Sequence, residues 1–80
     1  MGNTLRQDYS IGENLKRLRK QAGLTQKQVS AQLEVLQIPV TEDILAKIEQ
    51  GKYGIKIGVI VALKRIYGVK SYDAFFEGLE

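Results

Sequence analysis

The sequence contains no cysteine and no histidine among its 80 residues. Without cysteine there are no disulfides and no thiol nucleophile, and without histidine the usual zinc ligand sets and the commonest general base are missing. The remaining serine, aspartate, glutamate, lysine and tyrosine residues show no nucleophile placed beside a base, and there is no glycine-rich phosphate loop. We therefore expect no enzyme, no cofactor, no bound metal and no small-molecule substrate.

Long apolar runs are also missing. No segment approaches the roughly 18 apolar residues of a membrane span, and the opening MGNTLRQDYS lacks the basic-then-apolar order of a signal peptide. We expect a soluble, cytoplasmic protein that does not bind membranes. The length suits one small domain, which we assign to residues 9–80, preceded by a loose tail at residues 1–8.

The net charge is small, +3, but it is unevenly distributed. Residues 1–33 carry six basic residues against two acidic ones, and residues 51–80 carry five against three. Residues 34–50 carry one lysine against four acidic residues, a net charge of −3. An acidic segment thus lies between two basic ones, and this distribution says more about binding partners than the total charge does.

Capping motifs and apolar spacing predict two helices in the first half of the chain. Ser10 begins a capping box, and apolar residues then recur at steps of four, three and four until Gly23 ends the helix. In the segment LTQKQV, Thr25 and Gln28 form a second capping box. The helix that follows should be stopped by Pro39, which pushes the preceding residue towards an extended conformation.

Three more helices are expected in the second half. Thr41 caps a helix at about residues 42–50 that Gly51 terminates. The run VIVALKRIY has helical spacing and ends at Gly68, although the β-branched cluster at 55–61 would also suit a strand. Ser71 can cap a last short helix. The sequence therefore predicts an all-α domain of five short helices.

Three segments in order carry a family resemblance: LKRLRKQAGLTQKQVSAQL, VTEDILAKIEQGK and ALKRIYGV. Over residues 11–77 the chain resembles the helix-turn-helix domain of the phage-repressor class, the Cro and XRE type. The resemblance implies a compact five-helix fold of the lambda-repressor type, with the second and third helices as the helix-turn-helix. It also implies a small prokaryotic or phage transcriptional regulator that binds double-stranded DNA sequence-specifically, as a homodimer, with residues 41–50 in the major groove.

Two features depart from the usual pattern of that class. The segment EVLQIPV lengthens the turn before the third helix, which we interpret as a variant of the same fold. The third helix also opens with Glu42 and Asp43, where neutral or basic residues are more common. The two carboxylates can stabilise the helix through its dipole without any ligand, or Glu42 can accept a hydrogen bond from a cytosine amino group.

The resemblance assigns a role to each of several side chains. A structural ion pair joins Arg19 and Glu49. The residues that face the bases are Thr41, Glu42, Asp43, Ile44 and Lys47. The residues that contact phosphates are Gln26, Lys27, Lys52, Tyr53 and Lys56, for which ordinary solvated positions are the alternative.

The C-terminal apolar residues have two interpretations. Those on one face of the last helix, which either complete the core or join two copies of the chain, are Tyr72, Phe75, Phe76 and Leu79. The acidic segment also supports a rival function. In that alternative the same helical fold is a protein-protein interaction module whose acidic third helix docks a protein partner.

Overall fold

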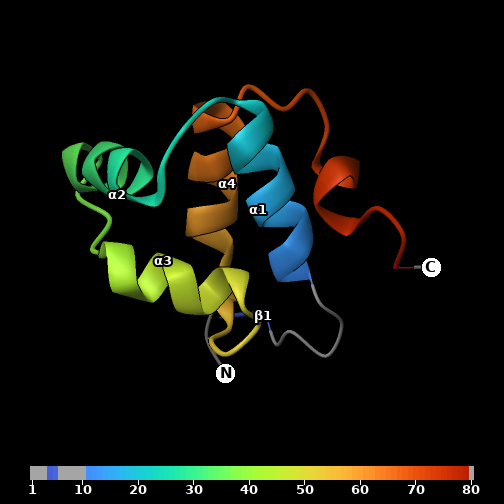
Figure 1. Cartoon of the computed structure of the whole chain (residues 1–80), viewed down its shortest axis with the longest axis horizontal. Helices are drawn as coiled ribbons and strands as arrows, with labels where there is room; N and C mark the ends of the chain where they lie inside the picture. The colour runs from blue at the N-terminus through green and yellow to red at the C-terminus, as the bar shows by residue number, and fades with distance from the viewer. Residues whose placement is uncertain (1–3, 6–10, 80) are drawn as a thin grey trace.

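The computed structural model describes residues 4–5 and 11–79, and its elements are shown in Figure 1. Two short strands, four α-helices and one 3-10 helix follow one another as β1 (Thr4–Leu5), α1 (Ile11–Gln21), α2 (Gln26–Val35), α3 (Glu42–Glu49), β2 (Ile55–Lys56), α4 (Ile57–Ile66) and η1 (Tyr72–Phe76). Helix α3 packs on both α1 and α2, while η1 packs on α1. Helix α2 and η1 lie at opposite sides of the molecule (Figure 1).

The described chain is mostly helical, as the sequence predicts, but the expected count of five α-helices is wrong. The last segment is a 3-10 helix of five residues, which Ser71 caps by accepting a hydrogen bond from the amide of Asp73 at 3.1 Å. Gly78 follows in the left-handed conformation, with φ of 83°. So short a segment forms tight i→i+3 turns more readily than a full α-helix.

A two-stranded antiparallel sheet also forms, with Thr4 opposite Lys56 and Leu5 opposite Ile55. The β-branched cluster is therefore divided, because its first residues form β2 while α4 begins at Ile57. Two residues of the expected N-terminal tail lie in β1. The rest of that tail, and the predicted cap Ser10, lie outside the described residues.

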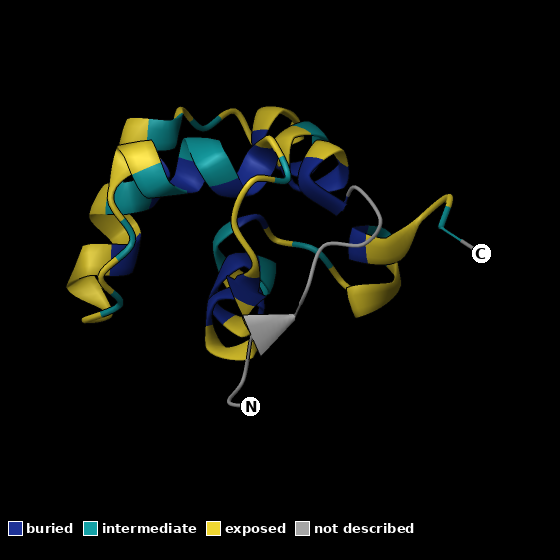
Figure 2. Cartoon of the chain, turned by 90° about the horizontal axis from the view of Figure 1, so that it is seen from below, coloured by how far each residue is buried: buried dark blue, intermediate teal, exposed yellow. Residues whose placement is uncertain are grey.

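Apolar side chains from the α-helices, β2 and η1 form one core. Figure 2 colours the ribbon by burial and shows the buried residues in dark blue. Its fully enclosed members are Leu15, Val29, Leu33, Leu45, Ile55, Leu63 and Phe75. Burial of each such side chain stabilises the fold by about 1.5–3 kcal/mol. The core therefore fixes the helices that carry the candidate site.

Helix α2 ends in a Schellman motif, in which two amides after the helix donate back to carbonyls of its last turn. Gln37 donates to the carbonyl of Glu34 at 2.8 Å, and Ile38 donates to that of Leu33 at 2.9 Å. Gln37 adopts φ of 62°, a conformation that favours glycine. The helix thus ends before Pro39, and the left-handed residue, not the proline, terminates it.

Gly12 lies where α1 meets the end of α3. A Cβ atom at this position would lie 2.3 Å from the carbonyl oxygen of Glu49 and 2.8 Å from that of Ile48. Only a residue without a side chain lets the two helices approach so closely. Gly12 therefore helps to set the position of α3 against α1.

Candidate nucleic-acid interface

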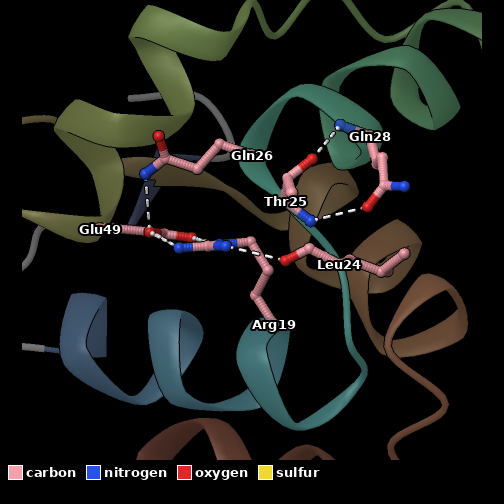
Figure 3. A network of polar contacts seen from close by, with 6 residues as sticks. All are labelled: Arg19, Leu24, Thr25, Gln26, Gln28 and Glu49. Atoms are coloured by element: carbon pink, nitrogen blue, oxygen red, sulfur yellow. Dashed lines mark hydrogen bonds and ion pairs between the residues drawn. The ribbon is translucent and has the colours of Figure 1, made fainter.

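A buried polar network fixes the ends of α2 and α3 to α1 (Figure 3). The Arg19 guanidinium donates through Nε to Glu49 Oε2 at 2.7 Å and through Nη2 to Glu49 Oε1 at 3.1 Å. Its Nη1 donates to the carbonyl of Leu24 at 2.8 Å. Arg19 and Glu49 are only 7% and 5% exposed, and the hydrogen bond with Glu49 raises the pKa of Arg19. This pair belongs to the scaffold and is not available to a ligand.

Gln26, expected at a phosphate, takes part in the same network. Its amide nitrogen donates to Glu49 Oε1 at 2.9 Å, as Figure 3 shows. The start of α2 is fixed independently by the predicted capping box, which is confirmed: Gln28 N donates to Thr25 Oγ1 at 3.1 Å, and Thr25 N donates to Gln28 Oε1 at 2.9 Å. The first turn of α2 is therefore rigidly oriented, with Lys27 exposed beside it.

The turn between α2 and α3, residues 36–41, is ordered by contacts at both ends. Ser30 Oγ in α2 donates to the carbonyl of Val40 at 2.8 Å. Thr41 Oγ1 accepts from the amide of Ile44 at 3.2 Å, which confirms the predicted N-cap of α3. Ile38 is half-buried and packs against the core. These contacts of the turn hold α3 in a defined orientation.

Helix α3 has one buried and one exposed face. The residues directed inward are Leu45, Ile48 and Glu49, and those exposed at its start are Thr41, Glu42 and Asp43. Ile44, expected to face bases, is half-buried and packs against the core. Helical periodicity adds half-buried Ala46 and exposed Gln50 to the outer surface, two residues that the resemblance did not supply.

Lys47 is held by two neighbours. Its Nζ lies 3.2 Å from Asp43 Oδ2, one helical turn earlier, and 5.4 Å from the centre of the Tyr53 ring. The hydrogen bond and the charge of Asp43 raise the pKa of Lys47, so this side chain keeps its positive charge. Lys47 and Asp43 therefore form a locally neutral pair on the exposed face of α3, which we call the candidate reading surface.

Basic residues follow α3 along the chain. Lys52 and Tyr53 lie in the loop after α3, and Lys56 is the last residue of β2. The side chains of all three are exposed. Exposed lysines therefore lie before and after the acidic start of α3 along the chain. Lys27 precedes it in the first turn of α2, and Lys52 and Lys56 follow α3.

The C-terminal apolar set is divided between the core and the surface. Phe75 is 0% exposed and Leu79 is half-buried against the core, whereas Tyr72 and Phe76 are 43% and 42% exposed. Phe75 therefore completes the core, and contact between copies through this residue is excluded. The Tyr72 ring is partly covered by Lys64, whose Nζ lies 5.2 Å from its centre.

Neither a membrane span nor a metal cluster is found in the residues that the structure describes. Across residues 4–5 and 11–79, no helix has the length and apolar content needed to cross a membrane. The same residues bring together no group of three or more acidic side chains that could hold a metal ion.

Comparison with known proteins identifies the family. A family model described as a helix-turn-helix domain matches residues 10–74, which contain α1 to α4 and the first part of η1. Searches of curated proteins and of solved structures gave no match to the chain. The family match covers most of the sequence and agrees with the arrangement of α2, the turn and α3. The chain therefore belongs to the helix-turn-helix domain family.

Proposed function

We propose that this protein is a small prokaryotic or phage transcriptional regulator that binds double-stranded DNA sequence-specifically. It is a variant of the phage-repressor (Cro and XRE) class with a lengthened turn before α3. Its α3 enters the major groove, and Thr41, Glu42, Asp43 and Lys47 face the base edges, with half-buried Ile44 beside them.

The observation that carries this proposal is the exposed outer face of α3 on a rigid support. The inner face is fixed by Leu45 and Ile48 in the core and by the bidentate pair of Glu49 with Arg19. A side chain can discriminate between bases only if its own backbone is held in place, because base contacts depend on hydrogen-bond geometry. The exposed first turn of α3 meets this requirement.

The acidic residues at the start of α3 do not exclude DNA. Phosphate contacts supply most of the sequence-independent attraction, and the exposed cations Lys27, Lys52 and Lys56 are available for them. Asp43 is already paired with Lys47. Glu42 is then the carboxylate that favours a cytosine amino group and disfavours other bases.

The proposal is tested by measuring binding to random duplex DNA as a function of salt concentration. The wild type should bind at low salt and lose affinity steeply as salt rises, because binding releases counterions from the DNA. The double variant Lys52→Ala, Lys56→Ala should bind more weakly and with a salt slope reduced by about two. The matched control is the double variant Lys16→Ala, Lys70→Ala, which removes the same charge from α1 and from the loop between α4 and η1. This variant should bind DNA nearly as tightly as the wild type does.

The outcome that opposes the proposal is the absence of salt-sensitive binding by the wild type. If the two double variants lost DNA affinity equally, total charge alone would explain the loss. That result would contradict the phosphate contacts assigned to Lys52 and Lys56. Folding of each variant is checked by its far-ultraviolet circular dichroism.

A protein-interaction module on the same fold is the second candidate, and one feature of the turn favours it. A cleft of about 480 Å³ opens beside the turn, and its lining includes the apolar residues Ile38, Pro39 and Val40 together with Glu34 and Glu42. Among the residues that the structure describes, none that lines this cleft is basic. This chemistry suits a cationic, partly apolar protein segment, and that function gains weight if the wild type fails to bind DNA.

A further inference from the structure

Two shallow hollows adjoin on the outer side of α4, which lies between α2 and η1 in Figure 1. The first, of about 320 Å³, lies between the end of α2 and α4. The second, of about 390 Å³, lies between α4 and the start of η1. Arg65 lines both, so the residues around the two hollows form one surface, which we call the α4 surface. Its apolar lining consists of Val35, Leu36, Val61, Ile66, Val69 and Tyr72.

Much of this apolar lining is open to solvent. Val35 is 82% exposed and Val61 is 51% exposed, and Leu36 and Tyr72 are each more than two-fifths exposed. Single exposed apolar residues are ordinary, whereas a group of them around hollows marks a contact with another molecule. The α4 surface therefore suits a partner that presents apolar side chains.

The charges on the α4 surface have one sign. The charged residues that line it, Lys64 and Arg65, are both basic. Within residues 4–5 and 11–79, Arg65 forms no ion pair. Lys64 is held in place by an aromatic ring, because its Nζ lies 5.2 Å from the centre of the Tyr72 ring. Both cations thus remain available to a carboxylate from outside.

The acidic neighbours along the chain do not neutralise these cations. Glu34 precedes Val35 but lines the cleft beside the turn between α2 and α3, and Asp73 follows Tyr72 but lines neither hollow. A second copy of the same surface would bring like charges together, which is unfavourable. An acidic partner is instead attracted.

We propose that the α4 surface binds an acidic, partly apolar segment of another protein. Apolar side chains of that segment enter the two hollows, and its carboxylates pair with Lys64 and with Arg65, whose planar guanidinium can donate two parallel hydrogen bonds to one carboxylate. Duplex DNA is the competing ligand for the two cations. Its phosphates would leave the apolar lining without a contact, whereas interfaces between proteins combine an apolar centre with arginine.

The α4 surface is separate from the residues assigned to DNA. Lys52, Lys56 and the outer face of α3 line neither hollow. The chain can therefore hold DNA and an acidic partner at the same time. This inference goes beyond the proposed function, and either can fail without the other.

Titration of the whole chain with designed peptides, followed by the NMR shifts of its backbone amides, tests the proposal. The probe is a helical peptide of about 15 residues, made of glutamate, alanine and leucine with the leucines on one face. Amides at Val35, Val61 and Arg65 should shift on binding, and those at Glu42 and Lys52 should not. Two further peptides are controls: lysine replaces glutamate in one, and alanine replaces leucine in the other. Each should bind at least about tenfold more weakly than the probe.

Substitutions in the chain test the two components of the surface separately. Arg65→Glu should weaken binding of the acidic peptide by about tenfold or more, because it places like charges opposite one another. Lys20→Glu is its matched control, since Lys20 is also an exposed basic residue of a helix but lines neither hollow. Val61→Ser should weaken binding by about fivefold. Ile57→Ser is its control and should bind as the wild type does, because Ile57 is an equally exposed residue of α4 outside both hollows.

The proposal is overturned if the acidic peptide does not bind, if either control peptide binds as tightly, or if Arg65→Glu and Lys20→Glu lose equal affinity. Random duplex DNA that displaces the peptide and shifts the same amides would assign the α4 surface to nucleic acid and would also overturn it. Shifts at these amides that depend on protein concentration alone would overturn it in favour of a second copy. Peptide binding at the α4 surface by a chain that fails to bind DNA would uphold this inference and refute the proposed function.

Discussion

Replacing Gly12 with alanine should destabilise the domain, because the backbone of α3 lies directly against this residue. The added Cβ would lie 2.3 Å from the carbonyl oxygen of Glu49, whereas ordinary contacts at such an atom begin near 3.4 Å. The opposing atoms belong to the backbone, so no flexible side chain can move aside. The substitution must therefore separate α1 from α3 and strain the ion pair that joins them.

The magnitude follows from two opposing effects. Overpacking a well-filled contact costs about 1–3 kcal/mol, and this close backbone approach points to about 3 kcal/mol. Alanine recovers about 1 kcal/mol of helix propensity. The expected net loss is about 2 kcal/mol, which for a domain of this size lowers Tm by about 8–16 °C. That is a large share of the roughly 4–12 kcal/mol by which a chain of this length is stable.

Thermal and urea unfolding followed by far-ultraviolet circular dichroism measure the effect. Gly58→Ala is the matched control, because Gly58 also lies in an α-helix but an added Cβ would meet nothing within 4 Å. The control should be stabilised, by up to about 1 kcal/mol. If Gly12→Ala were as stable as the wild type, the close packing of α1 on α3 would be refuted.

Four further substitutions test separate parts of the structure. Gln37→Gly should stabilise the domain by about 0.5–1 kcal/mol in urea unfolding, because it relieves a left-handed residue at the end of α2, and an unchanged midpoint would contradict that conformation. Glu49→Ala should cost about 3–5 kcal/mol, because it leaves the buried Arg19 guanidinium uncompensated, and a loss below about 1 kcal/mol would show that the pair is not buried. Burial raises the pKa of Tyr67, whose hydroxyl has no hydrogen-bond partner within the described chain. The unfolded state therefore loses this proton first, so the stability that Tyr67 contributes is complete below pH about 10 and falls above it. Tyr67→Phe should be at least as stable as the wild type at neutral pH and should lose less stability between pH 9 and about 11, and parallel pH profiles would contradict this. Glu42→Gln should change the base preference found in a selection experiment; a preserved preference with higher general DNA affinity would reduce Glu42 to a helix-stabilising role.

The helix starts could be predicted from the sequence because capping is local. Thr25, Thr41 and Ser71 each accept the backbone hydrogen bond expected of an N-cap, from an amide two or three residues further on. Such interactions depend on a few neighbouring residues and hardly on the rest of the fold. Apolar spacing then supplied the approximate extent of α1 to α4.

Most features that depend on distant parts of the chain could not be predicted from local patterns, and the one long-range pair that was predicted, Arg19 with Glu49, came from the family resemblance. The pairing of Thr4–Leu5 with Ile55–Lys56 joins segments far apart in sequence. The close approach at Gly12 appears only once α3 is docked on α1. The left-handed conformation of Gln37 was also missed, because glutamine carries no sequence signal for it and Pro39 offered a more obvious helix stop.

The candidate reading surface could be predicted in part. Thr41, Glu42 and Asp43 are exposed at the start of α3, because the N-cap defines the first turn. The rotation of the helix depends on which residues are buried, and α3 buries the charged residue Glu49, which an apolar pattern does not reveal. This rotation brings Ala46 and Gln50 to the outer surface and places Ile44 partly in the core.

Sequence-specific DNA binding is tested by selecting binding sites for the whole protein from a random duplex pool. Duplexes should be retained at low salt, and a short common sequence should be enriched that substitutions in the first turn of α3 alter. If two copies bind together, that sequence should recur as two half-sites about 34 Å apart or a multiple of it. A pool that is not retained at low salt, or that is retained without enrichment of any sequence, would contradict sequence-specific DNA binding.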